Sequence, residues 1–429
     1  MILVLLLAAP LLANGDLSHL WITSEALRRL PEGEPRALLS DPAVADMLAN
    51  GSIFPDGGYA VNDGYGEIAH WEPFQRAYAD WIRAAWGPPP YEGEAAEHAA
   101  FLFGMTSHGI ADQVYDALYM ERAHAEDAAS DWAAHSMDEA TDVAFAALVG
   151  PQDYGGIWVP DEVMAELMAE AAGHEVAADT IHSGQVMVRI ATEWAARAGE
   201  IEDTVARYER QFPWATRYQL DPRVLGNPPG EAEAVAATWQ ALWRALEDPA
   251  ADLGTVLRPW PADGWGIPGR EAGDPRARVA LLFSRGLSAA NAEQAAVEVD
   301  CGAGALPLTL RLFYGEHSHV LLVEPAEGWP ASALCALSVP GGMPFADPAT
   351  LPDPAPFATS FRTGPPAPVG CAARPGPARP WLVLVGACLW GALQSDRSRQ
   401  QRKPTSGTPR SGGRGRRAQA CSSSGRLSM

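Results

Sequence analysis

The sequence predicts a mainly α-helical, multi-helix bundle followed by a small antiparallel β-domain. From residue 16 to about 220, apolar residues recur at helical spacing in long stretches with little proline. After about residue 274, short β-rich runs alternate with turn residues. Residues 341–380 then hold eleven prolines in forty positions, which is typical of an extended linker. A chain of 429 residues has room for these parts as separate domains.

The helical domain is predicted over residues 16–270, with its core over 16–220. An amphipathic turn begins at Ser24, and Gly-Pro pairs at Gly87 and Gly150 end two of the later helical runs. The main runs expected to be helical are Phe74–Trp86, Glu94–Tyr119, Ser130–Leu148, Asp161–Gly173, His174–Ala198 and Glu231–Leu246.

The β-domain is predicted over residues 275–345 as a small antiparallel sandwich. Its expected strands are Arg278–Phe283, Ala295–Val299, Leu306–Phe313, His319–Val323 and Ala331–Val339. Cys301 and Cys335 are the two of the five cysteines that lie in this folded part. We predict that they pair, because the protein is expected to be exported and disulfides form outside the cytoplasm.

Both ends of the chain carry apolar segments that indicate export. Residues 1–15 read as a signal peptide cleaved before Asp16, or alternatively as an uncleaved anchor, since a basic start is missing. A Pro-rich linker over 346–380 leads to the apolar segment 381–393, whose helical length of about 20 Å is short for a bilayer core of about 30 Å. A basic, disordered tail follows over 394–429.

The pair Gly370-Cys371, the apolar segment and the Arg-rich residues after it resemble a myxobacterial-type C-terminal sorting tail. The alternative is a weak single-span transmembrane anchor. Both interpretations place the folded body outside the cytoplasm, either secreted or at the cell surface.

Charge and motifs exclude several classes of function. The formal net charge is −22, and the acidic body disfavours a nucleic-acid partner held by bulk charge. The chain has no phosphate-cradling Gly-rich loop, no Gly-x-Ser-x-Gly elbow and no cysteine in a nucleophile context. No protein partner is inferred.

The most informative pattern is a series of His and carboxylate residues. His108 and Asp112 are spaced to share one face of a helix, and His135 and Glu139 repeat that spacing. Upstream, His19 lies at the start of the first helix, Asp56 in a Gly/Pro-rich loop and His70 fourteen residues later. Nitrogen and oxygen donors without cysteine suit zinc or another borderline divalent ion. Several metals a few Å apart can clamp a phosphoryl group.

Together these motifs resemble the zinc-dependent phospholipase C family. The resemblance rests on the run Ser18-His19-Leu20-Trp21-Ile22, the Pro55-Asp56 loop, His70, and the two His-x3-carboxylate helices, and it covers about residues 16–220. The N-terminal domain of glycosylphosphatidylinositol-specific phospholipase D is a relative of that family, and the P1/S1 nucleases are more distant.

The resemblance implies the roles of individual residues and one to three zinc ions. It assigns Asp56, His70, His108 and Asp112 to a first zinc, and it makes Asp56 the general base. It assigns His135 and Glu139 to a second zinc, and His19 with a share of Asp112 to a third. At the second zinc the family has a further His, where this chain has Asp116, with His124 as the alternative.

This sequence departs from the family's pattern at two other positions, which affect the expected zinc sites and the expected substrate. The secreted enzymes of the family begin with a Trp that completes one zinc site, and no Trp precedes Trp21 here. Gly57 stands where choline-preferring enzymes carry an aromatic residue, which argues against choline preference.

The expected function is that of an exported zinc-dependent phosphoric diester hydrolase. The favoured reaction is phospholipase C/D-type cleavage of a phospholipid or lipid-linked phosphodiester by a metal-activated water, with the phospholipid or membrane surface as substrate. One alternative is a single-strand nuclease of the P1/S1 type, which would need an aromatic stacking slot near the metals. The other is a zinc-stabilised surface-binding module with little or no turnover.

Overall fold

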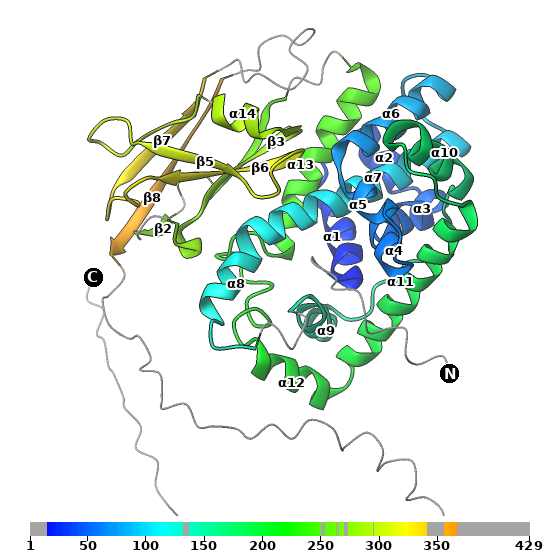
Figure 1. Cartoon of the computed structure of the whole chain (residues 1–429), viewed down its shortest axis with the longest axis horizontal. Coiled ribbons are helices and arrows are strands. Elements are labelled where there is room, and N and C mark those ends of the chain that lie inside the picture. The colour runs from blue at the N-terminus through cyan, green and yellow to red at the C-terminus, as the bar shows by residue number, and fades with distance from the viewer. Residues whose placement is uncertain are drawn as a thin grey trace, which may run out of the picture. The chain divides into compact units, whose positions relative to one another are not determined.

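A computed structural model describes residues 15–131, 137–249, 254–262, 264, 266–269, 273–294, 296–340 and 356–366. These residues belong to one compact unit, Met1–Pro368. A helical region comes first and a β-region follows it, as the sequence predicts (Figure 1).

Among the described residues, the helical region consists of α-helices with one π-helical turn and the short 3-10 turn η1 (Pro42–Val44). Its helices are α1 (Asp16–Arg29), α2 (Glu34–Leu39), α3 (Ala45–Gly51), α4 (Phe54–Ala60), α5 (Tyr65–His70), α6 (Glu72–Trp86), α7 (Glu94–Val114), α8 (Glu121–Glu126), α9 (Met137–Val149), α10 (Asp161–Ala172), α11 (Ala178–Gly199), α12 (Glu202–Gln211) and α13 (Pro228–Glu247).

Helix α7 is the centre of this region. It is apolar on nearly all sides, and almost every residue after its first turn is buried, as expected of a helix surrounded by others. Helices α3, α6 and α13 pack against it. The chain continues from α7 through the π-helical turn η2 (Tyr115–Met120) into α8. A π-helical turn inside a helix often marks a functional position.

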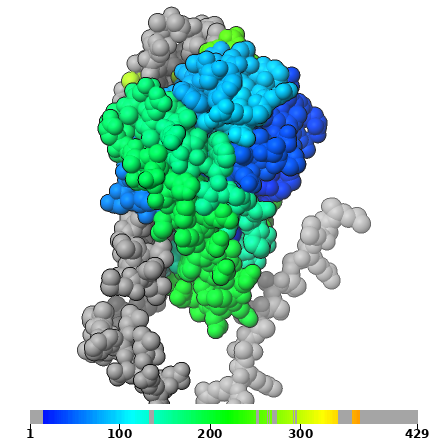
Figure 2. Space-filling view, turned by 90° about the vertical axis from the view of Figure 1, so that its right-hand side faces the viewer, coloured from blue at the N-terminus to red at the C-terminus, as the bar shows by residue number. Residues whose placement is uncertain are grey.

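Helices that are distant in sequence lie together around α7. Helix α11 packs against α4 and α9, and α1 packs against α7 and α13. Figure 2 shows the resulting surface, in which the blue N-terminal part of the chain and the green part around residue 200 form one face of the helical region. Residues far apart in the sequence can therefore meet beneath this face.

The described part of the β-region forms two four-stranded sheets. Its elements are β1 (Val256–Trp260), β2 (Gly266–Gly269), the 3-10 turn η4 (Pro275–Ala277), β3 (Val279–Leu287), α14 (Ala289–Gln294), β4 (Glu298–Asp300), β5 (Leu308–Leu312), β6 (Ser318–Pro325), β7 (Leu334–Val339) and β8 (Phe357–Pro366). The strand orders are β1-β3-β6-β5 and β2-β8-β7-β4, and every pairing is antiparallel except the parallel β2–β8 pair.

The first sheet buries both of its faces. On β3, Leu281 and Phe283 join the core between the two sheets, whereas Ala280 and Leu282 join the core of the helical region. Strand β6 alternates in the same way. This explains why Val279–Phe283 is a continuous apolar run, since a strand covered on both faces needs no polar side. The β-region is thus packed directly on the helices.

The observed β-region starts earlier and ends later than the range 275–345 predicted from the sequence. Strands β1 and β2 each contain a proline, which weakens a strand pattern, and both lie at sheet edges where proline is tolerated. Strand β8 lies within the Pro-rich stretch that we interpreted as a linker. The predicted disulfide between Cys301 and Cys335 is confirmed.

No helix among the described residues is both long enough and apolar enough to cross a bilayer. The predicted apolar segment 381–393 lies outside the described residues, as do residues 1–14 of the predicted signal peptide.

Candidate metal centre

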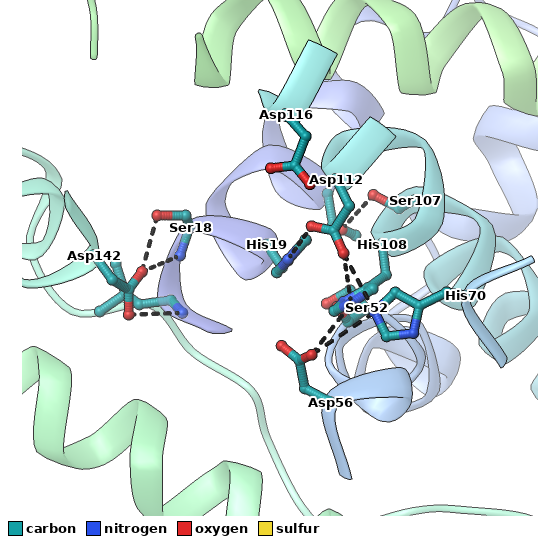
Figure 3. A network of polar contacts seen from close by, with 12 residues as sticks. Ser18, His19, Ser52, Asp56, His70, Ser107, His108, Asp112, Asp116 and Asp142 are labelled. Carbon is teal, nitrogen blue, oxygen red and sulfur yellow. Dashed lines mark hydrogen bonds and ion pairs between the residues drawn. The ribbon is translucent and has the colours of Figure 1, made fainter. Parts of the chain in front are cut away.

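The centre is built around His108 and Asp112 on helix α7. Their spacing of one helical turn places both side chains on the same face, and both are buried. Nε2 of His108 lies 3.3 Å from Oδ2 of Asp112. Figure 3 shows the Asp112 carboxylate pointing into the space among three imidazole rings.

His70, the last residue of helix α5, faces the same carboxylate. Its Nε2 lies 3.3 Å from Oδ2 of Asp112 and 2.9 Å from Nε2 of His108. The close approach of α5 to α7 depends on Gly109, because a Cβ at that position would lie 2.3 Å from the carbonyl oxygen of His70.

The tautomers of these two histidines follow from their backbone partners. Nδ1 of His70 lies 2.6 Å from the carbonyl oxygen of Gly66, and Nδ1 of His108 lies 2.8 Å from that of Ser52. A carbonyl oxygen only accepts, so both Nδ1 atoms donate a hydrogen. The two Nε2 atoms then face each other, and either a proton on one of them or a cation between them removes the repulsion of their lone pairs. Orientation of ligating histidines by such backbone contacts is usual at metal sites.

His19 enters from helix α1. Its ring stacks on that of His108, with centroids 3.8 Å apart, and its Nε2 lies 3.0 Å from Oδ1 of Asp112. The two oxygens of Asp112 therefore face different histidines, as a carboxylate shared between two metal positions would.

Asp56 completes the group from helix α4. It is buried, and its Oδ1 lies 3.8 Å from Nε2 of His70 and 3.7 Å from Nε2 of His108. Two sets of ligand atoms each lie within 4.8 Å of one another: His19, Asp56 and His108, and His70, His108 and Asp112. The structure thus brings together five of the residues that the sequence singled out, from four helices, and these buried groups could bind a metal ion.

The charges of the cluster shift the pKa values of its members. Burial alone would raise the pKa of Asp112, but His108 and His19 hold it well below its usual value. Burial alone would lower the pKa of His70, but Asp112 and Asp56 raise it to about 9. Burial raises the pKa of Asp56 despite the nearby His108 and His70. These carboxylates and imidazoles are therefore strongly coupled in a site shielded from water.

Asp16 is a member of the site that the sequence reasoning missed. It lies one turn before His19 on α1, so the two share a face. Its side chain is buried, and burial together with the charges of Asp56 and Asp142 raises the pKa of its carboxyl group well above the usual value. Its Oδ1 has no hydrogen-bond partner among the described residues. The only signal in the sequence was its i, i+3 relation to His19.

Asp142 on helix α9 fixes the start of α1. Its Oδ1 accepts hydrogen bonds of 2.8 Å from both the backbone N–H and the hydroxyl of Ser18, and its Oδ2 accepts one of 3.4 Å from the N–H of Leu17. Figure 3 shows this contact beside the metal centre. It satisfies N–H groups that have no partner within the helix and so orients His19.

Asp142 also predicts a pH dependence of stability. Burial raises its pKa from 3.8 to about 6 although Ser18 and Leu17 donate hydrogen bonds to it. The folded state then holds this proton more tightly than the unfolded state. The contribution of the protonated Asp142 to the free energy of unfolding is therefore complete below pH 4 and is lost as pH rises through 6. Relative to Asp142→Asn, the unfolding free energy of the natural chain should fall by about 3 kcal/mol over this range. Urea titrations with a chelator present measure it, and a pH-independent difference would contradict the assignment.

Of the second predicted pair, His135 and Glu139, the structure describes only Glu139. His135 lies outside the described residues. Glu139 is exposed on α9 and accepts a hydrogen bond from the hydroxyl of Tyr208. Asp116 is buried on η2 and accepts a hydrogen bond from the hydroxyl of Tyr314 in the β-region. Burial, followed by the charges of Asp112 and Asp138, raises the pKa of Asp116 well above its usual value. Asp116 is absent from both ligand groups that the described residues form.

A cleft of about 250 Å³ opens beside the centre. Asp56, His70 and Asp112 line it together with acidic and aromatic side chains from both regions: Tyr59, Glu67, Trp71, Asp116, Phe313 and Tyr314. Gly57, in contrast, faces helix α11, where a Cβ would lie 2.5 Å from the hydroxyl of Tyr65 and 3.0 Å from the backbone of Gly184. Packing thus explains the glycine, and Tyr59 supplies an aromatic face to the cleft instead.

Comparison with known proteins identifies distant relatives of one kind. The chain is 36% identical over 83 residues to phosphatidylinositol-glycan-specific phospholipase D of Rattus norvegicus, which covers 18% of this chain and 10% of that protein. Identity to the Mus musculus protein is 33% over 121 residues, 25% of this chain and 14% of that one. The Dictyostelium discoideum protein is 39% identical over 69 residues, 16% of this chain and 7% of that one. The chain is therefore distantly related to this phospholipase D, along a small part of either protein.

Other comparisons add little. No protein-family model matches the chain. The surface layer protein SbsC aligns with 67% of this chain and 40% of its own, at 9% identity and a TM-score of 0.20, which supports no conclusion.

Proposed function

We propose that this chain is a zinc-dependent phosphodiesterase that hydrolyses a phospholipid or a lipid-linked phosphodiester outside the cytoplasm. The observation on which this rests is the pair of buried Nε2 atoms of His70 and His108, 2.9 Å apart and bordered by the carboxylates of Asp56 and Asp112. The distant relationship to phosphatidylinositol-glycan-specific phospholipase D supports a hydrolase with a phospholipid-related substrate.

The donor set fits zinc. Three imidazoles and the carboxylates of Asp56 and Asp112 supply nitrogen and oxygen ligands without cysteine. His70, His108, Asp56 and Asp112 would hold one ion, and His19 with Asp112 would hold a neighbouring one. When bound, the metal supplies positive charge that stabilises the negative charge developing on the phosphoryl oxygens.

The chain itself supplies the base and the surroundings. Asp56 lines the cleft, and its Oδ1 lies 3.8 Å from Nε2 of His70, so its carboxylate can reach a substrate bound in the cleft. In the proposed reaction it accepts the proton of the attacking water. Helices α1, α4, α5 and α7 hold these groups in place, which limits the reorganisation that the reaction requires.

We infer that Asp16 is a ligand close to His19. The family has an N-terminal Trp at this zinc, whereas this chain has the buried carboxylate of Asp16 one turn before His19 on α1. We expect Asp16→Asn to weaken the binding of one zinc ion by about 10- to 100-fold, as for other changes close to a metal. Calorimetric titration of the zinc-free protein measures it. The exposed Asp41, which caps a distant turn, provides the control Asp41→Asn. Equal affinities in both variants would exclude Asp16 from the site.

A single-strand nuclease is the second candidate, because aromatic rings do line the cleft next to the cluster. Nuclease activity on single strands uses such rings for base stacking. The net charge of −22 opposes it.

One assay separates the candidates. The zinc-loaded full chain is incubated with mixed phospholipid vesicles and, in parallel, with single-stranded DNA. We expect a phosphomonoester product from the vesicles and no cleavage of the DNA. Cleavage of the DNA alone would replace the proposed function with the nuclease. Product analysis of the lipid shows which side of the phosphate is cut.

A further inference from the structure

The turn between strands β5 and β6 brings the β-region into the cleft. The hydroxyl of Tyr314 donates a hydrogen bond to Oδ2 of Asp116. The Tyr314 ring packs edge-on against Trp71, with centroids 4.9 Å apart. Phe313 and Tyr314 therefore form one wall of a cleft whose other walls come from α4, α5, α7 and η2.

Contacts from β6 and from its neighbour β3 hold this end of the β-region against the helices. The backbone N–H of His319, one residue into β6, donates a 2.7 Å hydrogen bond to Oε1 of Gln113 on α7. Glu72 on α6 accepts from Nε of Arg285 at 2.7 Å and from the N–H of Gly286 at 2.8 Å. The turn thus belongs to a packed interface.

The lining of the cleft indicates which chemical groups it accepts. Tyr59 and Trp71 both donate hydrogen bonds to Glu67, at 2.6 and 2.8 Å, which fixes their rings at the cleft wall. The rings offer faces for stacking or for a cation, and the carboxyl groups offer acceptors for hydroxyl or ammonium donors. Although burial alone would raise the pKa of Glu67, the hydrogen bonds from Tyr59 and Trp71 hold it below the usual value, so this carboxylate repels a second anion.

We propose that Tyr314 is a specificity-determining residue, which contacts the organic head group attached to the substrate phosphate and favours polar head groups without negative charge. The inference rests on the proposed function, because it places the phosphate at the cluster and the head group beside the turn. It also assigns a role to the β-region, which contributes a wall of the cleft.

The test compares Tyr314→Ala and Tyr314→Phe in the zinc-loaded full chain. Tyr154 is a matched control, since its hydroxyl also donates to a carboxylate, Oε1 of Glu193 at 2.7 Å, away from the cleft. The substrates are dihexanoylphosphatidylcholine and dihexanoylphosphatidylserine, which differ in head-group charge. We expect Tyr314→Ala to raise KM for the choline lipid by about tenfold with little change in kcat, in line with lost ground-state contacts, and to narrow the preference over the serine lipid. Tyr314→Phe and Tyr154→Ala should retain both the KM for the choline lipid and the preference for it over the serine lipid.

Two measurements keep this test independent of turnover. Zinc content should be unchanged in every variant, and calorimetric binding of a non-hydrolysable phosphonate analogue of the choline lipid should weaken by a similar factor in Tyr314→Ala alone. If the natural chain binds the analogue but hydrolyses no phosphodiester, the proposed function is wrong, while the inference about Tyr314 still stands. The inference would be overturned if folded Tyr314→Ala kept the KM, the lipid preference and the analogue affinity of the natural chain. Loss of zinc from that variant would also overturn it, because Tyr314 would then support the metal centre through Asp116.

Discussion

Asp112→Asn is expected to lose tight zinc binding and, with it, hydrolysis. Both oxygens of Asp112 face imidazole nitrogens, at 3.0 Å from His19 and 3.3 Å from His70 and His108. An amide keeps the shape but offers one weak oxygen donor and no charge. We expect zinc affinity to fall by more than about 100-fold, beyond the effect of a change outside the ligand set. Zinc saturation at about 1,000 times Kd stabilises the natural chain by about 4 kcal/mol, which the variant should lack.

Equilibrium dialysis with zinc and thermal unfolding with and without zinc measure the two effects. Asp127→Asn is the control, because Asp127 is also buried but accepts hydrogen bonds from the N–H groups of Trp214 and Ala215. That variant should bind zinc like the natural chain. If Asp112→Asn still binds zinc tightly, the ligand assignment is wrong.

Asp56→Asn should separate chemistry from metal binding. Asp56 stands farther from the imidazole nitrogens than Asp112, at 3.7 and 3.8 Å, and it lines the cleft. An amide cannot accept a proton from water, so kcat should fall by about 10²- to 10⁴-fold, the usual contribution of a general base. His70, His108 and Asp112 remain, and at least one zinc ion per chain should be retained.

Parallel measurement of zinc content and kcat distinguishes the outcomes. Full hydrolysis by Asp56→Asn would refute its role as the base. Loss of zinc together with hydrolysis would show that Asp56 acts chiefly as a ligand. Asp41→Asn serves again as a control that should change neither quantity.

The centre was predictable where its chemistry follows a local spacing. His108 and Asp112 had to share a helix face, and the structure places them on α7 with His70 and Asp56 opposite. The resemblance supplied His70 and Asp56, because nothing local connects two short helices to α7. Asp16 was missed because a single acidic residue at a helix start is usually explained by the helix dipole. Its burial beside Asp56 depends on tertiary packing.

The β-region contains both strands that the sequence pattern predicted and one that it did not. Strands β3 and β6 were recognisable as apolar runs, since both of their faces are covered. Strand β8 follows several prolines, so its composition predicted a linker, but it pairs with β7 over six residues. The contact between Tyr314 and Asp116 joins residues 198 positions apart. No local pattern encodes it, because it results from the packing of one region on the other.

The central claim is that the cluster of His19, Asp56, His70, His108 and Asp112 is a zinc centre. Its most direct test is the zinc content of the full chain after dialysis against metal-free buffer, beside the variant in which His70 and His108 are both replaced by alanine. We predict at least one zinc ion retained per natural chain and none by the folded double variant. A folded natural chain that retains no zinc, or a double variant that retains as much as the natural chain, would contradict the account.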